Sequence, residues 1–192
     1  MIKTIAFDYA GVIAPGPVSG WMKVNIPSGD KRHKIFSQYC KKWDMGGVNL
    51  QQYYEMISEV TETPPNLVWK TYFKNSVVNK EVIKIIKELK KNYKIVLFSN
   101  NFGELLRKVM DEQNITNLFD DIIISSEHKM VKPSVAFLNL MLFKVKNNRN
   151  EVVFIDDRQI NVDASNKLGI KALLYKDGFI LKKDLQGIGI QI

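Results

Sequence analysis

The feature that most constrains the fold of this 192-residue chain is a series of short apolar runs separated by longer amphipathic segments. None of these runs alternates apolar with polar residues, which is typical of strands buried on both faces of a sheet. They lie at residues 3–8, 94–99, 121–125, 151–156 and 170–175. The runs therefore predict a buried parallel sheet.

The segments between the runs have apolar residues at helical spacing. They lie at residues 79–92, 102–114, 134–147 and 159–169. Alternation of strands and helices is typical of a doubly wound α/β fold, in which the crossovers are right-handed. We therefore predict an α/β core with a doubly wound parallel sheet.

Residues 15–78 interrupt this alternation. The segment begins with "PGPVSG" and then has three helix-like pieces, at 31–43, 50–60 and 65–74. We interpret residues 15–78 as a small α-helical cap domain inserted after the first strand. Residues 1–14 and 79–192 would then form the core domain.

Composition limits the partners and the compartment. The net charge of +8 comes from lysines spread through amphipathic segments such as 79–92, which favours solvated helix faces over a nucleic-acid site. Cys40 is the only cysteine, so no internal disulfide forms and a reducing compartment is expected. No apolar run approaches the roughly 20 residues of a membrane span. We expect a cytoplasmic protein without a nucleic-acid or membrane partner.

Polar residues stand where several of the predicted strands end. They are Asp8 after the first run, Ser99 and Asn100 at the second, and Asp156 and Asp157 at the fourth. Ligands of open α/β sheets bind beyond the carboxyl ends of the strands, so these side chains are expected to converge. Lys132, which precedes the next helix, is expected to join them.

Such a group of residues suits a metal and an anion. Three carboxylates close together repel one another unless a cation neutralises them, and an all-oxygen set suits Mg²⁺. A lysine, a serine hydroxyl and free backbone N–H groups would meet an anionic ligand. The combination fits a phosphoryl group that passes through a charged transition state.

Four stretches together resemble a known family. "FDYAGVI", "LFSNN", "VKPSVAF" and "FIDDRQINVDASNKLGIKALL" are similar, in order and spacing, to the four motifs of the haloacid dehalogenase superfamily of hydrolases, most of which are phosphatases. The resemblance spans residues 1–14 and about 79–176. It implies a Rossmann-like core and hydrolysis of a small phosphorylated metabolite with Mg²⁺.

The resemblance also implies roles for the strand-end acids. Asp8 would be the nucleophile that becomes an aspartyl phosphate, and it would also ligate Mg²⁺. The backbone carbonyl of Ala10 and the carboxylate of Asp157 would be further ligands, with Asp156 acting directly or through water. Asn161 matches a position that supports the metal site.

The remaining implied roles concern the phosphate group. The residues expected to bind it are Tyr9, Gly11, Ser99, Asn100 and Lys132. Lys132 would also act in catalysis by offsetting charge on the phosphate and on Asp8. Gly11 would let the backbone turn and expose its N–H groups to the phosphate.

Ala10 departs from the pattern of the superfamily. Most of its phosphatases have a second Asp at this position, which protonates the departing alkoxide and then activates water. General acid–base catalysis typically contributes ~10²–10⁴-fold to the rate. We hypothesise that the substrate is an anomeric, acyl or aryl phosphate with a good leaving group, or that His33 of the cap is the acid.

The first motif is similar to those of more than one branch of the superfamily. It resembles the D-x-G-G-V and D-x-G-N-V motifs of glucose-1-phosphate phosphatases and of epoxide-hydrolase N-terminal domains. It also resembles the D-W-A-G-T of phosphonoacetaldehyde hydrolases, which use a cap lysine as a Schiff base. The cap lysines Lys31, Lys34, Lys41 and Lys42 are interpreted as a solvated face.

Four functions stay open at this point. The leading hypothesis is a Mg²⁺-dependent phosphatase that is a monomer or a homodimer. A phosphonoacetaldehyde hydrolase, a dehalogenase and a catalytically impaired binding or regulatory protein are the alternatives, although a dehalogenase needs no metal and hence no paired Asp156 and Asp157. The apolar tail, residues 184–192, suggests an edge strand or a dimer contact, with a packed terminus as the simpler interpretation.

Overall fold

A single parallel sheet forms the centre of the molecule in the computed structural model, which describes residues 1–74 and 76–192. Its strands are β1 (Thr4–Phe7), β2 (Lys94–Ser99), β3 (Asp121–Ile124), β4 (Val152–Asp156) and β5 (Lys171–Leu174). All five coincide with the predicted runs, and their order in the sheet is β3-β2-β1-β4-β5. The order reverses at β1, so the carboxyl end of this central strand is the expected ligand position in such a fold.

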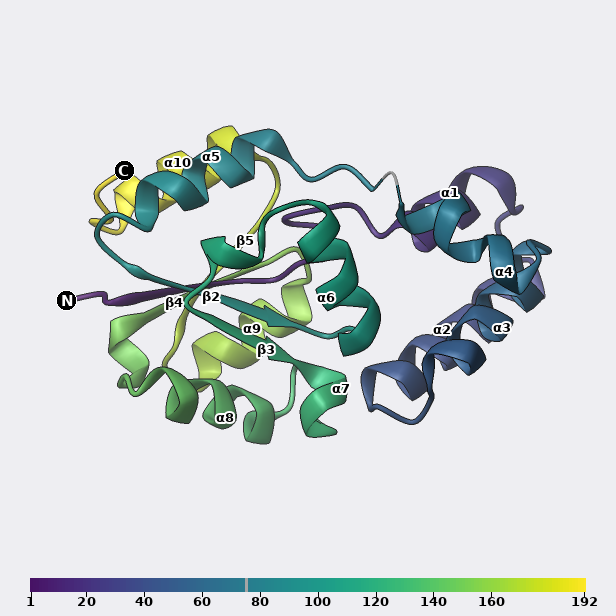
Figure 1. The fold of residues 1–192 in the computed structure, drawn as a ribbon. Coiled ribbons are helices and arrows are strands. Elements are labelled where there is room, and N and C mark those ends of the chain that lie inside the picture. The colour runs from purple at the N-terminus through teal and green to yellow at the C-terminus, as the bar shows by residue number, and fades with distance from the viewer. Residues whose placement is uncertain (75) are drawn as a thin grey trace.

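Helices cover both faces of the sheet (Figure 1). One face carries α5 (Lys80–Leu89), α6 (Gly103–Glu112) and α10 (Gly178–Gly187); the other carries α8 (Val135–Val145) and α9 (Gln159–Lys167). Successive strand residues pack into opposite layers: Phe7 contacts the first group of helices, whereas Ala6 lies with the second. Because both faces are covered, the strands are apolar throughout, as predicted.

Short elements connect the core strands and helices. They are η2 (Thr116–Leu118), α7 (Ser125–His128) and η3 (Arg149–Glu151). Among them α7 follows β3 directly, which places it at the carboxyl edge of the sheet. The doubly wound α/β fold is thus the observed one.

Five helical elements make up the segment between β1 and α5. They are α1 (Pro17–Asn25), α2 (Lys31–Asp44), α3 (Leu50–Thr61), α4 (Pro65–Val68) and the π-helix η1 (Trp69–Phe73). We call residues 15–78 the helical insertion; of these, residue 75 lies outside the described residues. Three pieces were predicted, but α1 was not, because its "PGPVSG" start is typical of a loop. Pro17 fits there because it occupies the first helical turn, where a missing N–H costs nothing.

The helical insertion leaves the core and returns to it at adjacent points. The backbone N–H of Asn79 donates to the carbonyl of Ile13 over 2.8 Å. The insertion lies at the end of the sheet opposite the chain termini, beyond the carboxyl ends of the strands (Figure 1). The division into a core domain and a cap domain stays a prediction, for which this junction is a physical argument.

The tail is a helix rather than an edge strand. Residues Gly178–Gly187 form α10, whose Leu181 and Leu185 are buried against the same layer as α5. Of the interpretations of residues 184–192, the packed terminus is the one that the structure has; the edge strand is not formed, and the dimer contact stays a prediction.

No helix within residues 1–74 and 76–192 is long and apolar enough to cross a lipid bilayer. The longest, α2, has 14 residues.

Candidate active site

Three carboxylates meet at the carboxyl end of β1 and β4. In the parallel register Phe7 pairs with Ile155, so the residues that follow, Asp8 and Asp156, lie side by side. One oxygen of each and one of Asp157 all lie within 4.8 Å of one another. Asp8 and Asp156 are buried, whereas Asp157 is exposed. The predicted convergence of these acids is what the structure has.

Lys132 supplies a positive charge between the two buried acids. Its Nζ lies 2.7 Å from Asp156 Oδ2 and 3.0 Å from Asp8 Oδ1, and it donates to the carbonyl of Phe98 over 3.0 Å. The Nζ also lies 5.0 Å from the centre of the Phe154 ring. Only 4% of the residue is exposed, so these contacts are shielded from water.

The side chain of Asn100 holds the backbone of Lys132 in place. Its Oδ1 accepts from the Lys132 N–H over 2.8 Å, and its Nδ2 donates to the Lys132 carbonyl over 3.0 Å. Asn100 thus positions the lysine through its amide group, a contact that the sequence did not indicate. Its predicted contact with phosphate concerns the backbone N–H and stays a prediction.

Asp156 is saturated with donors from the protein. Its Oδ1 accepts from the Arg158 N–H over 2.8 Å, and Asn161 Nδ2 lies 3.0 Å from each of its oxygens. Lys132 completes the set on Oδ2. Asn161 therefore orients Asp156. Because protein donors already occupy both of its oxygens, Asp156 is less free than Asp8 or Asp157 to bind a further partner.

Asp8, Asp156 and Asp157, which we call the acid cluster, carry an excess of negative charge over Lys132. Burial raises the pKa of Asp8 to about 6; the charge of Lys132 opposes this rise and the charge of Asp156 adds to it. Burial also raises the pKa of Asp157, with a further contribution from Asp156. Three carboxyls against one lysine are electrostatically unfavourable when all are ionised, which is a setting that a divalent cation relieves.

The Ser99 hydroxyl is an unused donor beside Asp8. It is fully buried and has no hydrogen-bond partner among the described residues, although it lies near enough to Asp8 to lower the pKa of that carboxyl. Buried polar groups in native proteins are nearly always paired, so an orphaned hydroxyl at this place is consistent with a ligand oxygen.

A glycine is required at position 11 for two reasons: its backbone conformation and the close approach of Asp157. Its φ is +84°, and a Cβ built on it would lie 2.2 Å from Asp157 Oδ2. The Gly11 N–H donates to the Ala14 carbonyl over 2.8 Å rather than facing the site, contrary to the prediction. A glycine is needed because Asp157 approaches the backbone closely.

Tyr9 donates its backbone N–H to Asp8 and lines the neighbouring cavity. Its N–H donates to Asp8 Oδ1 over 2.7 Å, and its buried hydroxyl has no partner within the described part of the chain. Burial raises the pKa of this hydroxyl to about 12. A phosphate contact from the Tyr9 N–H is therefore not available in this arrangement.

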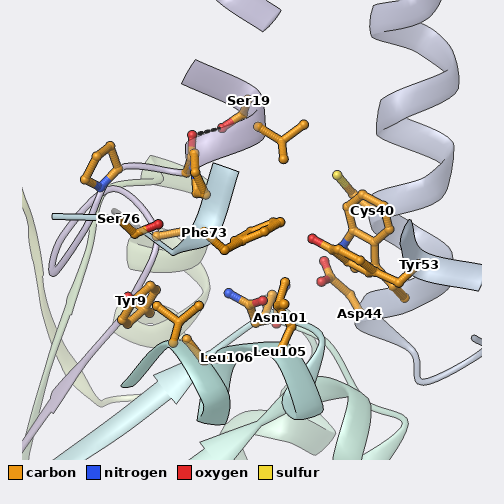
Figure 2. A pocket seen from close by; sticks show the side chains of 18 of the residues that line it. Tyr9, Ser19, Cys40, Asp44, Tyr53, Phe73, Ser76, Asn101, Leu105 and Leu106 are labelled. Carbon is orange, nitrogen blue, oxygen red and sulfur yellow. Dashed lines mark hydrogen bonds between the residues drawn. The ribbon is translucent and has the colours of Figure 1, made fainter. Parts of the chain in front are cut away.

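A cavity of about 190 Å³ lies between the core and the helical insertion (Figure 2). Tyr9, Ala10, Asn100 and Asn101 line it on the core side, directly after Asp8 and Ser99 in the chain. Its other walls are mostly apolar and include Phe36, Trp43, Tyr53, Phe73, Leu105 and Leu106. Asp8, Asp156, Asp157 and Lys132 are not among the described residues that line the cavity, but Tyr9 and Ala10 of the lining directly follow Asp8 in the chain.

One carboxylate stands among these apolar walls. Asp44, the last residue of α2, is half-buried and lines the cavity, and it forms no hydrogen bond or ion pair with the described residues. Burial raises its pKa to about 7; the charge of Asp8 adds to this rise, whereas Lys132 and Arg158 oppose it. Asp44 was not among the predicted site residues. The available signal was an acid at a helix C-terminus, where the helix dipole disfavours negative charge.

The predicted acid His33 lies elsewhere. Its Nε2 is 3.3 Å from the carbonyl oxygen of Ile26, and His33 does not line the cavity. It stands in the first turn of α2, about 16 Å along the helix axis from Asp44. The structure therefore does not support His33 as the missing acid.

The four lysines interpreted as a solvated face are exposed. They are Lys31, Lys34, Lys41 and Lys42. None of the described residues that line the cavity is a lysine. A buried Schiff-base lysine is thus not found there.

The family of the chain follows from a comparison with family models. Residues 29–175, more than half of the chain, match the model of the haloacid dehalogenase-like hydrolases, and the chain belongs to this family. The match begins after β1, so the assignment of Asp8 rests on its geometry and its motif.

Solved structures share the fold over nearly the whole chain. A haloacid dehalogenase family enzyme of Bacteroides thetaiotaomicron, in complex with magnesium and inorganic phosphate, has a TM-score of 0.72 and 19% identity over 92% of this chain and 95% of its own. L-2-haloacid dehalogenase of Xanthobacter autotrophicus has a TM-score of 0.69 and 15% identity over 100% of this chain and 85% of its own. A predicted hydrolase of this family from Porphyromonas gingivalis has a TM-score of 0.72 and 19% identity over the full length of both chains. At these identities the likeness shows the fold alone.

One curated relative matches part of the chain. Drimenol cyclase of Aspergillus calidoustus is 32% identical over 88 residues, which are 46% of this chain and 16% of the cyclase. The chain thus spans only a small part of the length of this relative.

Proposed function

We propose that this hydrolase is a Mg²⁺-dependent phosphatase that cleaves a small phosphate ester through an aspartyl phosphate on Asp8. The observation that carries the proposal is the acid cluster, in which three carboxylates and Lys132 meet at the reversal point of the sheet. The family enzyme of Bacteroides thetaiotaomicron, solved with magnesium and inorganic phosphate, supports it by analogy of fold.

The residues present fit a magnesium ion. Their donor atoms are oxygens, which Mg²⁺ prefers, and their excess negative charge favours a divalent cation. Asp8, Asp157 and the Ala10 carbonyl would hold the ion directly. Asp156 already accepts four hydrogen bonds from protein donors, so we assign it a contact through water. When bound, Mg²⁺ supplies positive charge beside the phosphoryl oxygens.

The chain's own residues would divide the reaction between them. The Asp8 carboxylate attacks phosphorus, and the bond from phosphorus to the ester oxygen breaks. Lys132 orients Asp8 and offsets negative charge next to the transferred group, and Ser99 offers its free hydroxyl to a phosphoryl oxygen. Water then cleaves the aspartyl phosphate and releases inorganic phosphate.

The cavity favours a substrate whose alcohol part is apolar or aromatic. Its walls include the rings of Phe36, Trp43, Tyr53 and Phe73, which would pack against an apolar or aromatic group. The helical insertion would act as a cap that covers the bound ester and excludes water. This gives the predicted cap domain its function.

The alternatives differ from this proposal in what they need. A phosphonoacetaldehyde hydrolase needs a lysine in the cavity, and the described lining has none. A dehalogenase shares the fold and would use Asp8, but it would not need the paired acids Asp156 and Asp157. A catalytically impaired protein is suggested only by Ala10.

Turnover of an aryl phosphate with and without Mg²⁺ tests the proposal. We expect Mg²⁺-dependent release of phosphate that Asp8→Asn lowers on the order of 10⁴-fold, because the nucleophile is lost. Asp163→Asn, an exposed acid on α9, is the matched control and should keep full activity. Metal-independent chloride release from 2-chloropropionate would identify a dehalogenase instead, and no turnover across a panel of esters would identify an impaired protein.

A further inference from the structure

We propose that Asp44 supplies the proton transfer that the residue at Ala10 lacks, as the general acid and base of the phosphatase. The inference rests on the proposed function, because a leaving-group acid has a role only if a phosphate ester is cleaved. Asp44 comes from the helical insertion, so the insertion would contribute to the chemistry and not only to substrate binding.

Asp44 faces the position that it would serve. Asp44 and Ala10 line the same cavity from opposite sides, one from α2 and the other from the residues that follow β1. Figure 2 shows the Asp44 carboxyl projecting from α2 into this cavity, near Tyr53 and Asn101. Because Tyr9 and Ala10 of this lining directly follow Asp8, the proposal places the leaving oxygen of an ester on Asp8 in this cavity.

The surroundings of Asp44 favour the protonated form that a general acid needs. It lies at the C-terminus of a 14-residue helix, where the partial charge is negative, and apolar walls surround it. The charged groups that face it from the core are Asp8, Lys132 and Arg158. A cavity that keeps one carboxyl protonated beside an ionised one is the arrangement that acid–nucleophile pairs of hydrolases use.

The other titratable groups of the cavity are poorer donors. Cys40 and Tyr53 both lie near Asp44, and burial raises the pKa of each, that of Cys40 to about 12. Burial also raises the pKa of Tyr9, which lines the cavity too, to about 12, so none of the three would give up a proton at neutral pH. Among the described cavity residues, Asp44 is the acid whose pKa suits proton transfer.

Contacts between the insertion and the core hold Asp44 over the site. The turn after α2 lies against α7: Gly46 has a φ of +70°, and a Cβ on it would lie 2.4 Å from the Ser126 carbonyl oxygen. On α3, the ring of Tyr53 stacks on that of Phe102 with centroids 5.1 Å apart and planes 13° apart. These contacts join the turn after α2 and the neighbouring helix α3 to the core, so they hold the end of α2 that carries Asp44.

The proton transfers balance over the two steps. In the first, the Asp8 carboxylate bonds to phosphorus, the electron pair of the breaking ester bond goes to the leaving oxygen, and the Asp44 carboxyl gives that oxygen its proton. In the second, the Asp44 carboxylate takes a proton from water as the water oxygen bonds to phosphorus and the bond to Asp8 breaks. Asp8 returns as a carboxylate and Asp44 as an acid.

The test compares alkyl and aryl phosphates of similar shape in wild type and Asp44→Asn. We expect kcat/KM for the alkyl ester to fall by ~10²–10⁴-fold, because its leaving oxygen needs a proton, and kcat/KM for the aryl ester to change less than about tenfold. With the aryl ester the variant should release a burst of alcohol before a slow steady state, since the second step also lacks its base. Glu55→Gln, an exposed acid on α3, is the control and should leave both esters unchanged.

An equal loss for both esters, or no loss for either, would overturn the role of Asp44 while wild-type turnover of the aryl ester still supports the phosphatase. Absence of wild-type turnover would refute the proposed function itself. The wild type also gives a test that needs no variant. Its kcat/KM across a series of esters should depend only weakly on the acidity of the leaving alcohol, and a steep dependence would overturn the proposal.

Discussion

The core side of the cavity pairs its charged groups with one another, whereas the side of the helical insertion has a carboxyl that is unpaired among the described residues. On the core side, Lys132 lies within 3.0 Å of both Asp8 and Asp156, and Asp156 accepts further hydrogen bonds from Arg158 and Asn161. On the side of the helical insertion, Asp44 stands among aromatic rings without a described partner.

The core side fixes the positions of its acids, whereas the side of the helical insertion raises the pKa of Asp44. Paired charges hold the core acids in one arrangement before a ligand arrives, as a reacting group requires. The half-buried carboxyl of Asp44, unpaired within the described part of the chain, has its pKa raised to about 7, above the value of about 6 for Asp8, so it holds its proton to a higher pH. Changes on each side should therefore have different effects.

Removing the charge of Lys132 should have the largest effect. Lys132→Met keeps the apolar stem but leaves Asp8 and Asp156 buried without a cation. We expect the free energy of unfolding in a chelator to fall by about 3–5 kcal/mol. Urea unfolding measures this, and added Mg²⁺ should restore part of the loss because it binds the folded state.

Lys87→Met on α5 is the control for this change, because Lys87 is exposed. Its free energy of unfolding should stay within about 0.5 kcal/mol of wild type. If Lys132→Met were equally mild, the core acids would not depend on the lysine.

Gly46→Ala should displace the helical insertion, and with it Asp44, from the core side of the cavity. The new methyl group would lie 2.4 Å from the Ser126 carbonyl oxygen, so the turn after α2 must move away from α7. We expect kcat/KM to fall on the order of 10²-fold, because small displacements of a reacting group are costly. Steady-state kinetics with an alkyl phosphate measures it.

Gly29→Ala is matched to this change, because Gly29 also has a positive φ, +92°, but no atom within 4 Å of a built Cβ. It should share the backbone strain of about 1–2 kcal/mol and keep normal kinetics. Equal kinetic losses in both variants would show that the contact with Ser126 does not position the insertion.

Gly11→Ala should change the core side alone. A Cβ at this position would lie 2.2 Å from Asp157 Oδ2, so Asp157 must shift. We expect the Mg²⁺ concentration for half-maximal activity to rise about tenfold, the usual size of a disturbed metal site. A Mg²⁺ titration measures this, with Gly29→Ala again as control; a titration like that of wild type would argue against Asp157 as a ligand.

The pH dependence of stability should report Asp44 in the metal-free protein. Its pKa is about 7 in the folded state and 3.8 in the unfolded chain, so the folded state binds more protons between these values. The contribution of Asp44 is therefore largest below the lower value and is lost as the pH rises through about 7, with a slope of at most about 1.4 kcal/mol per pH unit.

Asp44→Asn should remove this part of the slope when urea unfolding is followed across the same pH range. Asp8, whose pKa is raised to about 6, should still contribute a slope at lower pH. A variant with the slope of wild type would show that Asp44 is not held in its protonated form.

The sequence by itself determined the sheet and the residues of the acid cluster. Buried strands have a local signature, and the register of β1 with β4 follows from the fold class, so Asp8, Asp156 and Asp157 were predicted together. Helix α1 and the helical tail α10 were missed because glycines and a proline obscured their local pattern.

Only the tertiary structure decided how these residues are held and what faces them. The amide clamp of Asn100 on Lys132 and the position of Asp44 depend on contacts between segments far apart in the chain, whereas the internal use of the Gly11 N–H depends on the local turn to Ala14. Asp44 reaches the cavity because the turn at Gly46 packs against α7, a docking that leaves no trace in the spacing of residues. The place of a side chain across an interface is set by packing, and no local pattern encodes it.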